Sequence, residues 1–143
     1  MAQSTAQRRT DNCSTGKKAD SLLRIVVADD HTLVRRFVCG VLAAEGWQIC
    51  GEASNGHEAV QVTLQQKPDI AVLDLCMPEL NGLDATRHIL KRMPDIMVFI
   101  LTLEDGEHVA RAVLESGAAA YVQKTDLQRL LRQLRRVRRD RAA

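Results

Sequence analysis

Four short apolar runs and one mixed segment alternate with five segments that have helical features, and this alternation constrains the fold of the 143-residue chain most strongly. The apolar runs predict strands over residues 25–28, 70–73, 97–101 and 120–122, and the mixed segment WQICGEA predicts another over 47–53. The other segments predict helices over residues 32–45, 57–66, 83–92 and 106–116, and a last helix that opens with a capping box at Thr125 and Gln128. Strands that are apolar throughout are buried on both faces, so we expect a parallel sheet covered by helices.

Polar side chains stand where four of these strands end. Asp29 and Asp30 follow the first strand, Asp74 follows the third, Thr102 the fourth and Lys124 the fifth. Ligands of such sheets bind outside the carboxyl ends of the strands. We therefore expect three carboxylates, a hydroxyl and an amine to converge on one rim.

This set of groups suits phosphoryl chemistry. Clustered carboxylates repel one another, and a hard cation such as Mg²⁺ or Mn²⁺ relieves the repulsion through oxygen ligands. Lys124 and Thr102 would bind phosphoryl oxygens, and Asp74 is the candidate nucleophile for an aspartyl phosphate. Any one of these acids alone would be interpreted as a solvated loop residue. The joint position of the acids, the threonine and the lysine at four strand ends favours a functional site.

Composition excludes several other functions. Aromatic residues make up only 3% of the chain, too few for a platform on which bases stack. No apolar run is long enough to span a membrane, and the N-terminus lacks the apolar segment of a secretory signal. The four cysteines show no CxxC spacing, which argues against a zinc site or a disulfide framework and favours reduced thiols in a cytoplasm.

The charge is divided unevenly along the chain. Residues 129–143 hold seven arginines and one acid, whereas residues 25–128 hold eight basic and 15 acidic residues. An acidic body with a basic end is not typical of a nucleic-acid-binding domain. We interpret the arginines as the solvent face of the last helix, and contact with DNA phosphates as the alternative.

Four sequence pieces, in order, resemble the receiver domain of bacterial response regulators. They are VVADDH, VLDLCMPELNG, ILT and AYVQK, and the stretches ADDHTLVRR, GEASNGHEAV and ESGAAAYVQK look most like the NarL/FixJ branch. The resemblance covers residues 24–139. It implies a doubly wound, flavodoxin-like (βα)5 fold with five parallel strands in the order 2-1-3-4-5.

The same resemblance implies roles for the acidic residues and the lysine. Asp74 matches the phospho-acceptor, and Lys124 matches the lysine that binds the phosphoryl group. Asp30 matches the direct ligand of Mg²⁺, and Asp29 matches the acid that orients metal-bound water. Cys76 stands where a backbone carbonyl completes the metal shell.

Thr102 and Tyr121 match the pair of residues that changes conformation when the acceptor aspartate is phosphorylated. The sequence departs from the family beside this pair, because Leu103 stands where a small residue is usual. We expect Leu103 to narrow the path of water to the phosphoryl group, and Glu104 to face solvent rather than position that water. Thr125 replaces a common proline, which excludes a cis Lys–Pro bond.

These features predict a phospho-accepting switch rather than a metabolic enzyme. Its expected partners are a sensor histidine kinase and a second copy, paired through the first and last helices; DNA would be reached only through a helix-turn-helix domain outside this chain. A stand-alone receiver acting through protein contacts or phosphotransfer is the alternative, and a flavodoxin-like cofactor binder or a phosphatase is less favoured. We expect a flexible tail over residues 1–23, the receiver domain over 24–139, and a tail or linker over 140–143.

Overall fold

The computed structural model describes residues 23–142. Its elements alternate between strand and helix along the chain: β1 (Arg24–Ala28), α2 (Thr32–Ala44), β2 (Gln48–Ala53), α3 (Gly56–Gln66), β3 (Ile70–Asp74), α4 (Gly82–Arg92), β4 (Met97–Thr102), α5 (Glu107–Ser116), β5 (Ala120–Gln123) and α6 (Leu127–Ala142). Within this part of the chain, no helix is long and apolar enough to cross a membrane.

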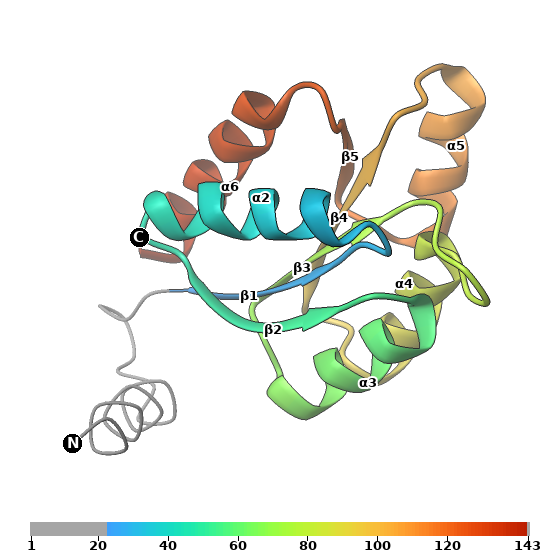
Figure 1. Ribbon diagram of the computed structural model, residues 1–143, viewed down its shortest axis with the longest axis horizontal. Helices are drawn as coiled ribbons and strands as arrows, with labels where there is room; N and C mark the ends of the chain where they lie inside the picture. The colour runs from blue at the N-terminus through green and yellow to red at the C-terminus, as the bar shows by residue number, and fades with distance from the viewer. Residues whose placement is uncertain (1–22, 143) are drawn as a thin grey trace.

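The five strands form one parallel sheet in the order β2-β1-β3-β4-β5, which confirms the predicted fold. Helices α2 and α6 cover one face of the sheet, and α3, α4 and α5 cover the other (Figure 1). Side chains alternate between the faces along each strand: Val27, Val72 and Phe99 pack under α2 and α6, whereas Leu73 and Ile100 pack on the opposite side. The central strands are therefore buried on both faces, as their unbroken apolar runs predict.

Helix α6 is fixed to the sheet by an apolar stripe and to its surroundings by polar contacts. Leu130 and Leu134 are fully buried in the core beneath it. The Arg138 guanidinium lies 4.1 Å from the centre of the Trp47 ring, and Arg135 pairs with Glu45 at the end of α2 at 2.9 Å. The two helices on this face are thus joined by charge as well as by apolar packing.

The helix and strand bounds agree with the sequence prediction to within a residue or two, but the residue that caps α6 is not the predicted one. Thr125 does not cap this helix; the side chain of Asp126 accepts a hydrogen bond from the Arg129 N–H at 3.2 Å, and the helix starts at Leu127. The predicted capping box is therefore wrong, and aspartate, a preferred N-cap residue, takes the role. Helix α6 continues to Ala142, and the tail predicted over residues 1–23 lies, apart from Leu23, outside the described residues.

Two glycines allow the loop after β3 to pack closely. A Cβ on Gly82 would overlap the carbonyl oxygen of Asp74, and a Cβ on Gly56 would overlap the carbonyl oxygen of Leu80. The Gly82 N–H donates to the Leu75 carbonyl at 2.9 Å, so α4 begins directly against the end of β3. These contacts fix the position of the backbone that carries Asp74.

The ends of the described chain meet at one side chain. The Arg24 N–H donates to Asp69 Oδ2 at 2.9 Å, and the Arg141 guanidinium contacts Asp69 Oδ1 at 3.1 Å. Asp69 precedes β3, so this junction lies at the edge of the sheet where the strands begin, opposite the edge where they end.

Candidate functional site

Lys124 joins two buried carboxylates at the carboxyl edge of the sheet. Its ammonium nitrogen lies 2.9 Å from Asp29 Oδ2 and 3.0 Å from Asp74 Oδ1. Asp29 follows β1, Asp74 ends β3 and Lys124 follows β5, so three strands bring these groups together. The Lys124 N–H donates to the Thr102 carbonyl at 2.8 Å, which fixes the lysine beside the end of β4.

The acidic groups form a cluster of oxygen donors. Carboxylate oxygens of Asp29, Asp30 and Asp74 all lie within 4.8 Å of one another, with Asp30 exposed and the other two buried. Asp29 is held in place because its Oδ1 accepts the His31 N–H at 2.9 Å and its own N–H donates to the Ala53 carbonyl at 3.0 Å. A donor set of carboxylates open to solvent on one side fits a hard divalent cation such as Mg²⁺, which keeps several waters.

Burial raises the pKa of Asp74 to about 6, from an ordinary value of 3.8. The hydrogen bond from Lys124 lowers this pKa, and the nearby charge of Asp29 raises it, but desolvation is the larger effect. For Lys124, burial alone would lower the pKa, yet its bonds to Asp29 and Asp74 outweigh that effect and raise it. The lysine therefore stays charged, and Asp74 is mostly ionised at neutral pH.

Thr102 and Tyr121 are both bonded to the loop that follows β4. The buried Thr102 Oγ1 accepts the Glu104 N–H at 2.9 Å. The Tyr121 hydroxyl donates to Asp105 Oδ1 at 2.6 Å, and this bond raises the pKa of Tyr121 and lowers that of Asp105. Glu104 is exposed, in the orientation expected from the sequence.

Leu103 is 73% exposed and lies at one end of an apolar groove near the carboxylates. This groove, of about 390 Å³, runs between the start of α2 and the loops that follow β4 and β5. Leu33 and Phe37 line it and are 76% and 63% exposed, and Lys124 lines its inner end. Exposed apolar side chains gathered in this way mark an interaction surface.

Cys76 contributes its backbone rather than its thiol. The Cys76 N–H points to Asp74 Oδ1 at 3.4 Å, and its side chain is exposed. Burial, followed by the charge of Asp74, raises the pKa of the Cys76 thiol, so it remains protonated at neutral pH.

Sequence reasoning missed two features around these residues. It did not identify Asp105 as the partner of Tyr121, because the pair is 16 residues apart and Asp105 stands in a loop without a motif. It also did not separate Leu33 and Phe37 from the buried residues of the same helix, because all of them follow the helical period.

Comparison with known proteins identifies the class of protein that this fold and site define. Residues 25–135 match the model of the response regulator receiver domain, and the chain therefore belongs to that family. The expectation drawn from the sequence motifs is confirmed.

Individual relatives include a response regulator and a putative transcriptional regulator. The chain is 34% identical over 118 residues to the response regulator GacA of Pseudomonas aeruginosa, covering 81% of this chain and 55% of GacA. A putative transcriptional regulator of the same organism is 33% identical over 103 residues, covering 72% of this chain and 50% of that protein. The chain thus spans about half the length of these relatives.

Solved structures agree with this placement. A LuxR-family two-component response regulator from Aurantimonas sp. SI85-9A1 superposes with a TM-score of 0.77 at 31% identity, covering 84% of this chain and 87% of that one. The receiver domain of the putative response regulator NarL from Mycobacterium tuberculosis superposes with a TM-score of 0.70 at 30% identity, covering 73% of this chain and 85% of that one. The predicted likeness to the NarL and LuxR-type regulators is therefore confirmed.

Proposed function

We propose that this receiver accepts a phosphoryl group from a sensor histidine kinase on Asp74, and that Mg²⁺ assists the transfer. The observation that carries the proposal is the position of Lys124, whose ammonium bridges Asp29 and Asp74 at 2.9 and 3.0 Å. A fixed cation between two buried carboxylates is what an incoming phosphoryl dianion needs for charge neutralisation.

Asp74 offers one oxygen for the attack. Its Oδ1 contacts Lys124 and the Cys76 N–H, whereas Oδ2 has no hydrogen-bond partner among residues 23–142. We assign Oδ2 as the nucleophile. A new bond forms from Oδ2 to phosphorus, the bond from phosphorus to the donor's imidazole nitrogen breaks, and that nitrogen keeps the electron pair. Hydrolysis later replaces the bond to Oδ2 by one to a water oxygen and restores the carboxylate.

The residues that would hold Mg²⁺ are Asp30, Asp74 and the Cys76 carbonyl, with Asp29 orienting a bound water. When bound, the ion neutralises charge on the phosphoryl oxygens. Lys124 would bind a second phosphoryl oxygen and leave its place between the two carboxylates.

Thr102 and Tyr121 would report phosphorylation to the surface. Thr102 would exchange its bond with the Glu104 N–H for one with the phosphoryl group, and Tyr121 would leave Asp105 and turn inward. Such a switch shifts the balance between two existing states. The surface formed by α5, β5 and α6 would carry the change.

The apolar groove is the surface that we assign to the kinase. Its exposed Leu33, Phe37 and Leu103 lie beside Lys124, so a helical partner seated there would present its phosphohistidine to Asp74.

Replacing Phe37 by serine should slow transfer from a phosphorylated kinase domain and leave transfer from acetyl phosphate unchanged. Leu114, 74% exposed on α5, provides the matched control, and equal effects of the two serine variants would exclude this docking site.

We propose transcription control as the output, through a helix-turn-helix domain outside this chain, because one of the named relatives is a putative transcriptional regulator. A stand-alone receiver is the alternative. We place the switch in the cytoplasm, where the thiols of Cys39 and Cys76 would remain reduced.

Pairing of two copies through α2 and α6 remains a proposal. Glu45, one of the acids available to offset the arginines of these helices, already pairs with Arg135 of its own chain. Sedimentation with and without beryllofluoride tests the dimer, and a monomer under both conditions would exclude it.

Acetyl phosphate with Mg²⁺, followed by measurement of the intact mass, tests the site itself. We expect one phosphoryl addition in the parent protein and none in Asp74→Ala. Asp30→Ala should lose the dependence on Mg²⁺ concentration, whereas alanine at the exposed Asp95 should change nothing. A single addition that persists in Asp74→Ala would overturn the assignment.

A further inference from the structure

The seven arginines of α6 fall into two groups. Three of them bind the body of the domain: Arg135 pairs with Glu45, Arg138 covers the Trp47 ring, and Arg141 pairs with Asp69. These three therefore have a structural role in holding the helix to the domain.

The other four arginines form a separate row, which we call the arginine stripe: Arg129, Arg132, Arg136 and Arg139. Their spacing of three, four and three residues places them along one side of the helix, over a length of about 15 Å. All four are exposed, and none forms an ion pair with another residue between 23 and 142. Four like charges in a row repel one another, so an anionic partner would stabilise them.

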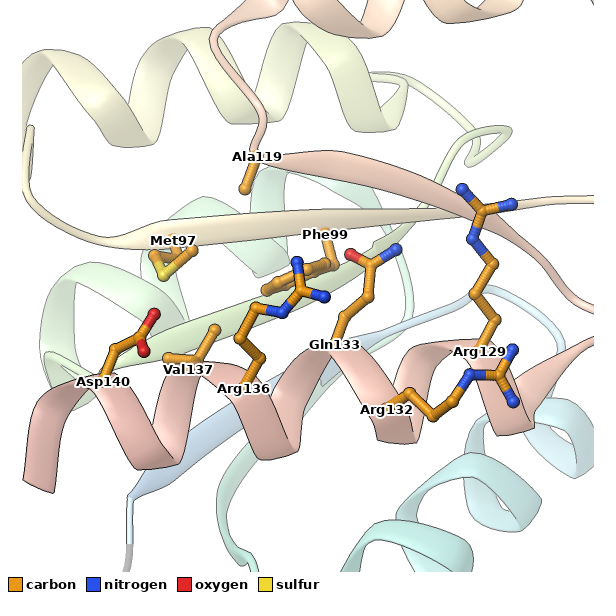
Figure 2. Close-up of a pocket in the computed structure, with 9 residues that line it drawn as sticks. All are labelled: Met97, Phe99, Ala119, Arg129, Arg132, Gln133, Arg136, Val137 and Asp140. Atoms are coloured by element: carbon orange, nitrogen blue, oxygen red, sulfur yellow. The ribbon is translucent and has the colours of Figure 1, made fainter.

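A cleft of about 550 Å³ lies beside the stripe, between α6 and the beginnings of β4 and β5. Its floor is apolar, and its rim carries three arginines and one acid, Asp140. In Figure 2, the side chains of Arg129, Gln133 and Arg136 extend from the helix toward the strands, and those of Gln133 and Arg136 end beside Phe99. Such a site would accept a ligand that is both acidic and apolar.

This cleft is separate from the proposed phosphorylation site. Phe99 and Val137 belong to the core under α2 and α6, whereas Tyr121 packs into the core on the opposite face of the sheet. Asp74 stands at the edge where the strands end, whereas Met97 and Ala119 stand where β4 and β5 begin. A ligand in the cleft would therefore not touch Asp74, although the cleft borders the surface of α5, β5 and α6 that we propose to change on phosphorylation.

We propose that the arginine stripe and its cleft are the docking site for an acidic amphipathic helix of another protein. The carboxylates of this helix would pair with the stripe, and one apolar side chain would enter the cleft over Met97 and Phe99. Arginine suits this role because its planar guanidinium binds carboxylates through two hydrogen bonds. A helix carrying acids at matching spacing would meet all four arginines along one face.

The surroundings favour a peptide over a nucleic acid. A nucleic acid would extend beyond the stripe and meet the acidic body, where residues 25–128 carry 15 acids against eight bases. Asp105 and Asp126, for example, stand outside the cleft, in the loops that precede α5 and α6. A phosphate backbone would also gain nothing from the apolar floor. The chain's own residues 1–22 are no match, because they hold four basic residues and two acids.

The test uses a fluorescein-labelled 16-residue peptide with glutamates at the spacing of the stripe and leucines between them. Fluorescence anisotropy should show binding to the unphosphorylated protein that weakens as salt is raised. Replacing Arg132 and Arg136 together by glutamine should weaken binding about tenfold. Ala119→Leu, which fills the cleft without a change of charge, should also weaken it. The control variant Arg92→Gln/Arg111→Gln loses the same charge elsewhere and should bind like the parent.

Three further measurements test whether binding requires the charges of the peptide, its apolar side chains and the charges of the stripe. A peptide with glutamine for glutamate and one with serine for leucine should both bind more weakly. The variant Arg132→Glu/Arg136→Glu should instead bind a peptide with lysines in place of the glutamates, which shows that the surface is folded and contacted directly. Equal binding to the parent, the stripe variants and Ala119→Leu would overturn the proposal. So would tighter binding of a 16-base-pair DNA duplex at the same stripe, or binding seen only in a dimer of this chain.

Discussion

Asparagine in place of Asp74 should stabilise the fold at neutral pH when no divalent cation is present. The variant keeps the shape of the side chain and an oxygen that accepts the bond from Lys124, but it removes a buried negative charge. Burial raises the pKa of Asp74 to about 6, against 3.8 for an ordinary aspartate. That difference corresponds to about 3 kcal/mol of unfolding free energy that the parent protein loses once the carboxylate is ionised.

The sign follows from proton binding. Because the pKa is higher in the folded protein, the folded state holds the proton more tightly, and stability falls as the pH rises from about 4 to about 6. The advantage of Asp74→Asn should therefore be about 3 kcal/mol at pH 7.5 and about half of that at pH 5. These values already include the bond with Lys124, which lowers the pKa of Asp74 and so offsets part of the cost of burial.

Urea unfolding in EDTA at the two pH values measures this difference. Asp95→Asn serves as the control, since Asp95 is exposed in the loop after α4 and its replacement should change stability by less than about 0.5 kcal/mol. Added Mg²⁺ should stabilise the parent protein more than Asp74→Asn, because the cation binds the carboxylate that the variant lacks. An advantage that is absent, or equal at both pH values, would refute the assignment of the cost to the buried charge.

Three other predictions concern residues around the site. Leu103→Ala should lose its phosphoryl group faster, by about tenfold if the leucine adds about 1.4 kcal/mol to the barrier; an unchanged half-life of the phosphoprotein would refute the steric argument. Asp105→Ala should lower the pKa of Tyr121, the single tyrosine of the chain, and titration of the phenolate absorbance would read this directly; an unchanged midpoint would mean that the bond is not kept in solution. Gly82→Ala should destabilise the fold because its Cβ would meet backbone atoms, whereas Gly40→Ala in α2 has open space and should stabilise the fold by up to about 1 kcal/mol. Thermal unfolding of both variants measures the two effects. Similar shifts of the unfolding temperature would count against the close packing of the loop after β3.

Periodicity and strand-end chemistry predicted most of this fold, because four of the five strands are short apolar runs with a polar residue at the carboxyl end. The approach of Asp29, Asp74 and Lys124 follows from the parallel arrangement alone, since strands that share one direction share one edge. Contacts between loops could not be predicted in this way. The bond from Tyr121 to Asp105 depends on the path of a loop, and no local pattern encodes that path.

Composition was a poor guide to the arginines of the last helix. It showed a run of like charge, but only the packed helix separates Arg135, which pairs with Glu45, from Arg132, which faces solvent. The capping of α6 by Asp126 is a similar case. Both Thr125 and Asp126 are suitable cap residues, and the packing of the helix on the sheet decided between them.

The junction at Asp69 has a consequence for redesign of the chain. Since Asp69 holds both Arg24 and Arg141, the two ends of the domain are neighbours, and a short bridge could join them. New termini could then be opened in the exposed loop around Asp95, which would yield a circular permutant with the same sheet. Because the junction lies where the strands begin, a sensor or fluorophore fused there would sit at the end of the molecule remote from Asp74 and leave the carboxylate edge free.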